Sequence, residues 1–328
     1  MAALFLASLL VFAQAVCTDA YAQQNAPRLD PAGWGGDHVG QPVPEYIDSG
    51  ECLFCHRLDV GEAWAKDRHN LTLRDAGPEE PALAALTADA AAREFASQVE
   101  LLLGGGRQTR FLKRSAAYGK LELLSVRAHQ GRGRRFLLSE TDGPHWDAQA
   151  FGDRCAGCHA TGVDSRERTF SAISLDCYVC HGAAPLEHAN DAHLMPLAKK
   201  RNDPPRIVAS ICGQCHLRGG KSRSTGHPYP NNFVAGDNLF KDFQVDWAKA
   251  DDPQLINPGD RHVWRNIRSI AVDGREDMTC LTCHAVHGRS TARHRALADE
   301  QYCGHCHDPG RAKSFVRQYE AHSKLCEY

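Results

Sequence analysis

Apolar and polar residues follow several different patterns along the chain, and each pattern predicts a different kind of element. Residues 2–16 form an uncharged apolar stretch that is too short to span a bilayer. The run AYA, which ends at Ala22, supplies the small residues that a signal-peptide cleavage site requires. We therefore expect 1–22 to be a signal peptide and the exported chain to begin near Gln23. A buried N-terminal helix is the alternative.

The rest of the chain divides into four patterned stretches. Residues 23–50 are rich in Gly and Pro and predict an irregular arm. An Ala-rich stretch, 83–99, predicts a helix that stops at three glycines, 104–106. The apolar runs RFLKR, KLELLSV and RRFLL, separated by Gly and Arg, predict a small antiparallel sheet within 107–139. From 150 onward we expect short helices and loops, followed by a terminal helix in the tail 311–328.

The overall composition is that of an ordinary globular protein, with 42% hydrophobic and 24% charged residues. Lys and Arg (38) nearly balance Asp and Glu (40), so the charge favours neither a nucleic-acid partner nor a polybasic membrane surface. After the signal peptide, no apolar run is long enough for a transmembrane helix. The unusual feature is the presence of 14 Cys and 18 His with only 3 Met.

Most of these cysteines fall in one repeated pattern, Cys-x-x-Cys-His. A random chain of this composition would contain about 0.03 copies of the pattern, which is the attachment motif of c-type haem. This chain contains six. They are Cys52, Cys55 and His56; Cys155, Cys158 and His159; Cys177, Cys180 and His181; Cys212, Cys215 and His216; Cys280, Cys283 and His284; and Cys303, Cys306 and His307.

The spacing of the motif suits covalent haem. Two thiols on one turn can both form thioethers with the haem vinyl groups, and the adjacent His can ligate the iron. Zinc sites and redox-active disulfides also use Cys-x-x-Cys pairs, but neither gives a reason for a His after every pair. We therefore predict six haem c groups. Cys17 is lost with the signal peptide, and Cys326 is left over.

The remaining histidines are candidate second ligands to the irons. Because Met195 and Met278 are the only methionines after Met1, the composition favours bis-histidine iron. The leading candidates are His69, His188, His227, His262 and His287. Further candidates are His38, His193, His294 and His322, whereas we expect structural or outward-facing roles for His129, His145 and His305.

These patterns predict a mostly α and irregular multihaem cytochrome c, with short helices and loops packed round six haems. A small antiparallel β insert is expected near 107–139. The first haem module is expected at 51–75, a helix and small sheet without haem at 76–149, and a five-haem module at 150–310.

The motifs and the segments around them resemble the multihaem c-type cytochromes with doubled CxxCH motifs. That family is related to the tetrahaem cytochrome that accepts electrons from hydroxylamine oxidation. The similar segments are CLFCHRLDVGEAWAKDRH, GGGRQTRFLKR with GKLELLSV, CAGCHATG, CYVCHGAAPLEH, CGQCHLRGG, CLTCHAVHG and YCGHCH. The resemblance covers most of residues 50–310, and it implies that His69, His188 and His287 are distal ligands.

Two classes of function remain open from the sequence. The first is an exported, periplasmic or extracellular electron carrier that exchanges electrons with redox partner proteins, with self-association into a haem filament as one version. The second is an oxidoreductase in which one five-coordinate haem acts on a small nitrogen or sulfur compound. No CxxCK motif is present, but the second, fourth and sixth motifs have no obvious nearby partner His.

Overall fold

The structure is a computed structural model that describes residues 28–104, 108–131, 135–139, 142–199, 201–251 and 258–287. The predicted signal peptide and the predicted terminal helix lie outside these ranges. So do Cys17, His294, Cys303, His305, Cys306, His307, His322 and Cys326. Of the helices in the described ranges, none is both long enough and apolar enough to cross a membrane.

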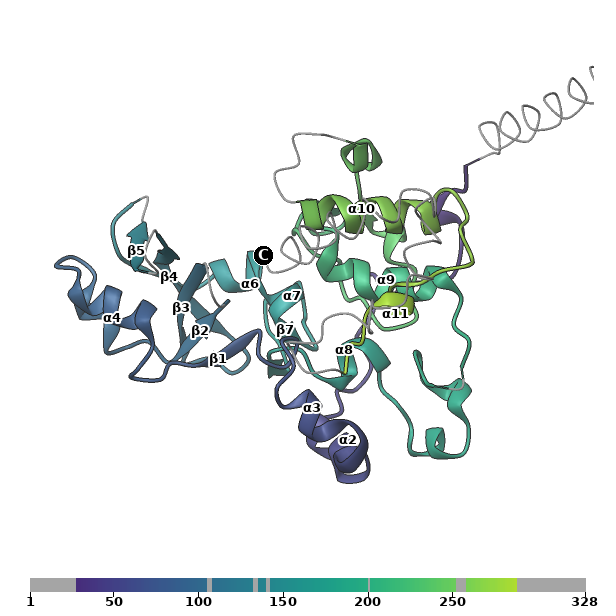
Figure 1. The fold of residues 1–328 in the computed structure, drawn as a ribbon, viewed down its shortest axis with the longest axis horizontal. Helices are drawn as coiled ribbons and strands as arrows, with labels where there is room; N and C mark the ends of the chain where they lie inside the picture. The colour runs from purple at the N-terminus through teal and green to yellow at the C-terminus, as the bar shows by residue number, and fades with distance from the viewer. Residues whose placement is uncertain are drawn as a thin grey trace, which may run out of the picture.

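Short helices separated by loops make up one part of the molecule, and a β-sheet makes up the other (Figure 1). The α-helices are α2 Ser49–His56, α3 Glu62–Trp64, α4 Pro81–Ala88, α5 Arg93–Ala96, α6 Ala150–Arg154, α7 Ala156–His159, α8 Cys177–His181, α9 Pro205–His216, α10 Pro258–Ala271 and α11 Cys280–Cys283. Tighter or wider turns are η1 Pro31–Gly33, the π-helical η2 Arg57–Gly61, η4 Leu186–Ala189, η5 Ala192–Leu194, η6 Leu239–Lys241 and η7 Trp247–Asp251.

The main sheet is antiparallel, with the strand order β1-β2-β3-β4-β5 and with β6 also paired to β4. Its strands are β1 Leu73–Asp75, β2 Leu101–Leu103, β3 Gln108–Arg114, β4 Leu121–Gln130, β5 Phe136–Ser139 and β6 Trp146–Asp147. Two small two-stranded sheets pair β7 Ala160–Thr161 with β8 Ala172–Ile173, and β9 Lys221–Ser222 with β10 Phe243–Gln244.

The main sheet is larger than the sequence predicts, and the helix before it is shorter. The predicted helix over 83–99 is wrong as a single element, because α4 ends at Ala88 and α5 begins at Arg93. Asp89 causes the break: its backbone is extended, and its side chain accepts hydrogen bonds from the backbone N–H groups of Ala91 and Ala92. Leu101–Leu103 then forms the buried strand β2, which pairs with β1 outside the predicted sheet.

Apolar residues cover both faces of this sheet. On one face, Leu112 and Leu123 belong to a core that includes Phe151 of α6 and Ala156 of α7. On the other, Phe111 packs in a second core with residues of α4. The sheet is thereby fixed directly against the helices that carry the second Cys-x-x-Cys-His motif.

A third core holds the helical part together. α10 buries Trp264, Ile267 and Ile270, which recur at the three-residue spacing of one helix face. They pack with Leu217, which follows α9, and with Leu239 of η6. This core supports the fourth motif, because α9 ends in it.

Candidate functional site

Each described Cys-x-x-Cys-His motif lies on a short helix or at the end of one. The first, third and fifth motifs form α2, α8 and α11, the second spans the start of α7, and the fourth closes α9. Asp48 and Asp176 begin α2 and α8 by accepting hydrogen bonds from backbone N–H groups of the first turn. In the first, third and fourth motifs, helical geometry then places the two cysteines, three residues apart, on the same face.

Three histidines of these motifs face histidines from distant parts of the chain. The ring centroids of His56 and His188 are 6.1 Å apart, those of His181 and His287 are 6.0 Å apart, and those of His216 and His69 are 6.3 Å apart. The first member of each pair belongs to the first, third and fourth motif, respectively. The second members are the three histidines that the family resemblance implies as distal ligands.

Hydrogen bonds orient four of these six rings through the same nitrogen. Nδ1 of His56 lies 3.0 Å from Asp59 Oδ2, and Nδ1 of His69 lies 2.9 Å from Asp67 Oδ1. In two other rings Nδ1 bonds a backbone carbonyl, at 2.8 Å for His181 with Pro196 and 2.5 Å for His188 with Pro185. Engagement of Nδ1 leaves Nε2 to bind a metal and fixes the tautomer that can do so.

Partial loss of contact with water lowers the pKa of several of the rings. Desolvation by neighbouring groups lowers the pKa of His216 to about 4, with help from the charges of His69 and Arg218. Desolvation also lowers the pKa of the half-buried His181 and of His287. A lowered pKa favours the neutral imidazole, which is the form that can bind a metal.

The second motif differs from the first, third and fourth, because its histidine forms no described ring pair. His159 is half-buried, and burial together with the charge of Arg218 lowers its pKa to about 4. Its Nδ1 is inaccessible to solvent and has no hydrogen-bond partner within the described ranges. Such an orphaned buried nitrogen carries a desolvation cost, and a ligand or a bound group would offset it.

Helices of different motifs pack against one another, α2 on α8 and α9 on both α7 and α11. Thiols interact across these contacts, Cys52 with Cys177, Cys158 with Cys215 and Cys212 with Cys280. Cys158 Sγ also lies 3.9 Å from the carbonyl oxygen of Gln214, and Cys215 Sγ lies 3.6 Å from that of Gly157. The first motif therefore adjoins the third, and the fourth adjoins both the second and the fifth.

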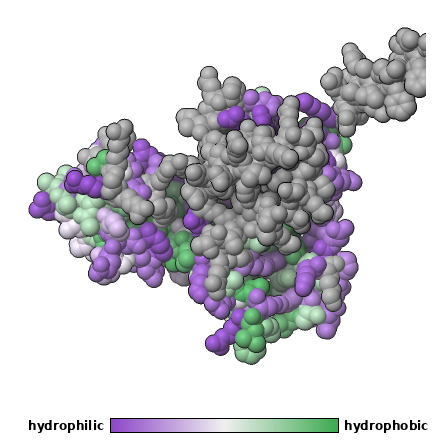
Figure 2. Space-filling model, viewed as in Figure 1, coloured by the Kyte–Doolittle hydropathy of each residue, from purple (hydrophilic) through white to green (hydrophobic). Residues whose placement is uncertain are grey.

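Large apolar side chains surround the first histidine pair. Phe54 and Leu58 are 88% and 99% exposed on α2 and η2, and Leu186, two residues before His188, is 88% exposed. Figure 2 shows hydrophobic residues gathered at the end of the molecule that α2 forms in Figure 1. An apolar macrocycle held between His56 and His188 would pack against such side chains.

The spacing of the ring pairs can be compared with what one iron would require. A bond from a first-row metal to an imidazole nitrogen is about 2.0 Å, and the ring centroid lies about 1.2 Å further, so two imidazoles on one iron have centroids roughly 6.4 Å apart. The three observed separations, 6.0–6.3 Å, agree with this value. These residues therefore fit a bis-histidine haem iron.

Other predicted ligands lie elsewhere. His227 stacks on Tyr229 with ring centroids 5.0 Å apart, and its Nδ1 lies 3.2 Å from the carbonyl oxygen of Asp153. His262 is exposed on α10, beside Asn266. His38 bonds Asp237 through Nδ1 at 2.9 Å. Within the described ranges, none of these three forms a ring pair with a motif histidine.

The residues that orient the rings were not predicted from the sequence. Asp59 follows His56 by three residues and Asp67 precedes His69 by two, so both spacings were visible signals. The contact between Trp64 and His287, whose ring centroids are 6.2 Å apart, joins residues far apart in the chain and could not be anticipated. Within the described ranges, no cluster of three or more His, Cys, Asp or Glu forms a candidate metal site.

Comparisons with known proteins found one similar structure. No family model matches the chain, and no curated protein matches it. The undecaheme cytochrome from the S-layer of Carboxydothermus ferrireducens is similar over 81% of this chain and 44% of its own length, with 15% sequence identity and a TM-score of 0.45. The chain thus spans less than half of that cytochrome.

Proposed function

We propose that the protein is an exported c-type cytochrome that carries electrons on six covalently attached haems, most of them with two histidine ligands. The observation that carries this proposal is the set of three histidine pairs, each joining a Cys-x-x-Cys-His motif to a distant histidine at a separation of 6.0–6.3 Å. Within the described ranges no cluster of three or more His, Cys, Asp or Glu could hold a zinc ion, and a disulfide framework gives no reason for such pairs.

The chain's own residues have three tasks in this function. The two cysteines of each motif hold a haem by thioethers, and the adjacent histidine binds its iron. His188, His287 and His69 would complete the first, third and fourth sites. The Nδ1 partners, such as Asp59 and Asp67, hold the rings in the orientation that ligation needs. Haem c, when bound, supplies one-electron chemistry at iron.

Contacts between motifs support electron transfer rather than isolated storage. Because α2 of the first motif packs on α8 of the third, and α9 of the fourth packs on the helices of the second and fifth, the groups that these motifs hold would be close neighbours. A closely spaced series of carriers is what transfer through a protein requires. The electron donor and acceptor would be redox proteins, and self-association into a filament remains one version of this proposal.

Counting covalent haem by intact-mass measurement tests the proposal. We expect six haems on the wild-type chain and five on the double variant Cys177→Ala/Cys180→Ala. Cys326→Ala is the matched control and should retain six, because that cysteine belongs to no motif. The chain should be purified after co-expression with haem-attachment machinery. If the purified chain then carries zinc, or no covalent haem, that result would contradict the proposal. An oxidoreductase with one open iron is the second candidate, and it predicts one high-spin iron in the oxidised holoprotein.

A further inference from the structure

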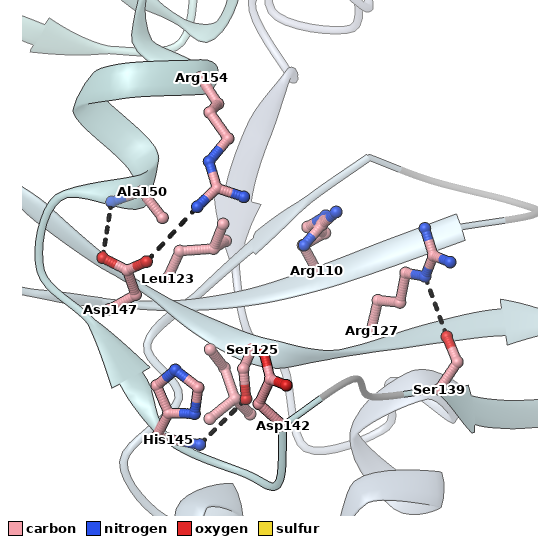
Figure 3. Close-up of a pocket in the computed structure, with 11 residues that line it drawn as sticks. Arg110, Leu123, Ser125, Arg127, Ser139, Asp142, His145, Asp147, Ala150 and Arg154 are labelled. Atoms are coloured by element: carbon pink, nitrogen blue, oxygen red, sulfur yellow. Dashed lines mark hydrogen bonds and ion pairs between the residues drawn. The ribbon is translucent and has the colours of Figure 1, made fainter.

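A cleft lined by arginines opens on the main sheet beside the second motif. Its cavity volume is about 310 Å³, and it opens to solvent. Its lining includes Arg110 of β3, Arg127 of β4 and Arg154 of α6, which Figure 3 draws together with their neighbours. Ligand-binding clefts in proteins commonly have volumes of roughly 300–1,000 Å³.

The arginines occupy a sheet face that is apolar elsewhere. Leu112 and Leu123 are paired across β3 and β4 and belong to the core that contains α6. Arg110, Arg127 and Leu123 all line the cleft, so the two arginines lie on the same side of the sheet as this leucine. The register between the two strands shifts between Arg110 and Leu112. Such irregularities redirect side chains and are frequent next to functional sites.

The two strand arginines are an unfavourable pair by themselves. Arg110 and Arg127 are direct cross-strand partners, and like charges in that position destabilise a sheet. Arg127 Nε donates a hydrogen bond to Ser139 Oγ at 2.9 Å. Within the described ranges, neither of the two arginines forms an ion pair with a carboxylate.

Carboxylates in the cleft only partly offset its positive charge. Arg154 Nη2 lies 3.6 Å from Asp147 Oδ2, and Asp147 also accepts hydrogen bonds from two backbone N–H groups through Oδ1. Asp142 is the other acidic residue of the lining. Among the described residues of the lining, three guanidinium groups therefore share the cleft with two carboxylates, and Figure 3 shows Arg110 lying between Arg127 and Arg154.

We propose that this cleft binds a small anion with at least two negatively charged oxygens, held mainly by Arg110 and Arg127. A guanidinium group binds such oxygens through two parallel N–H bonds, and an anion between the two arginines would relieve their repulsion. Inorganic oxyanions of the sulfate type and small dicarboxylates share this chemistry. Because Arg154 directly precedes Cys155, the bound anion would lie beside the second haem-attachment site.

Calorimetric titration of the full-length holoprotein with sulfate, and separately with succinate, tests the proposal at constant ionic strength set by chloride. We expect saturable binding of at least one probe, weakened about tenfold or more by Arg110→Gln and by Arg127→Gln, because each removes a charge-assisted contact. The matched control is Arg93→Gln, which removes the same charge from an exposed site on α5 and should leave the affinity unchanged.

Each result of the titration either supports or overturns the anion-binding proposal. Binding of sulfate alone identifies an inorganic oxyanion site, and binding of succinate alone identifies a dicarboxylate site; both support the proposal. Absence of binding of both probes at millimolar concentration overturns it. The proposal is also overturned if Arg93→Gln weakens anion binding as much as the two cleft variants do, because the loss would then reflect the net charge of the protein. Arg154→Gln provides a third cleft variant if either strand substitution disturbs folding, which far-ultraviolet circular dichroism would reveal.

Discussion

Removal of one distal histidine should change one iron and leave the others as they are. His188→Ala deletes the ring that faces His56 at a centroid separation of 6.1 Å. If both rings ligate the same iron, that iron loses its sixth ligand and becomes high-spin, while the irons of the other motifs keep theirs. The expected change is therefore one high-spin iron among six.

The same substitution should cost the fold little. His188 is half-exposed, and the one described hydrogen bond of its side chain joins Nδ1 to the carbonyl oxygen of Pro185 at 2.5 Å. Loss of a single such bond destabilises a protein by about 1 kcal/mol. The space left by the ring opens toward solvent, so free imidazole added to the variant should enter it and restore the low-spin state.

Electron paramagnetic resonance with spin quantitation provides the assay. His129→Ala is the matched control, because His129 lies in β4 within the sheet and pairs with Gln108 and Leu137. The control should show no new high-spin iron. A spectrum of His188→Ala that equals the wild-type spectrum, or a high-spin signal that imidazole leaves unchanged, would refute the assignment of His188.

Three further predictions concern stability. Gly157→Ala should destabilise the protein by about 1–3 kcal/mol, because its Cβ would lie 2.2 Å from Cγ of the buried Tyr229; Gly77→Ala, with open space around it, is the control in urea unfolding. Tyr46→Phe should cost about 1–2 kcal/mol in the same assay, because it removes the 2.5 Å hydrogen bond to the buried carboxylate of Asp176, and equal stability would argue against that bond. Hydrogen bonds from the backbone N–H groups of Gln149 and Ala150, the former having the larger effect, lower the pKa of Asp147 below its usual 3.8. Wild type should therefore have a larger free energy of unfolding than Asp147→Asn above pH 3.8, and this difference should disappear as the pH falls through the lowered pKa of Asp147. A difference that does not depend on pH would contradict this prediction.

The sequence predicts the local features of the candidate site better than its long-range ones. Each motif needs only one helical turn, so the spacing of Cys52, Cys55 and His56 is sufficient to predict the geometry of α2. The partner of a motif histidine depends on the tertiary fold. His188 reaches His56 across much of the chain, and no periodicity distinguishes it from His227, which stacks on Tyr229 instead.

The same limit applies to the fold. The apolar runs around β3 and β4 identify two strands, because their residues form the alternating buried faces of a sheet. Leu101–Leu103 gives no such signal, since three consecutive leucines fit a helix or a strand equally well. Pairing with β1 and β3, which buries all three leucines, decides in favour of a strand.

The central claim is that histidine pairs ligate most of the haem irons. Spin quantitation of the fully oxidised holoprotein, with covalent haem counted on the same sample, tests it most directly. We predict six haems per chain with low-spin ferric iron predominating, including the three sites formed by His56 and His188, His181 and His287, and His216 and His69. A spectrum in which high-spin iron predominates would contradict the account, and high-spin iron at a single site would favour the oxidoreductase instead.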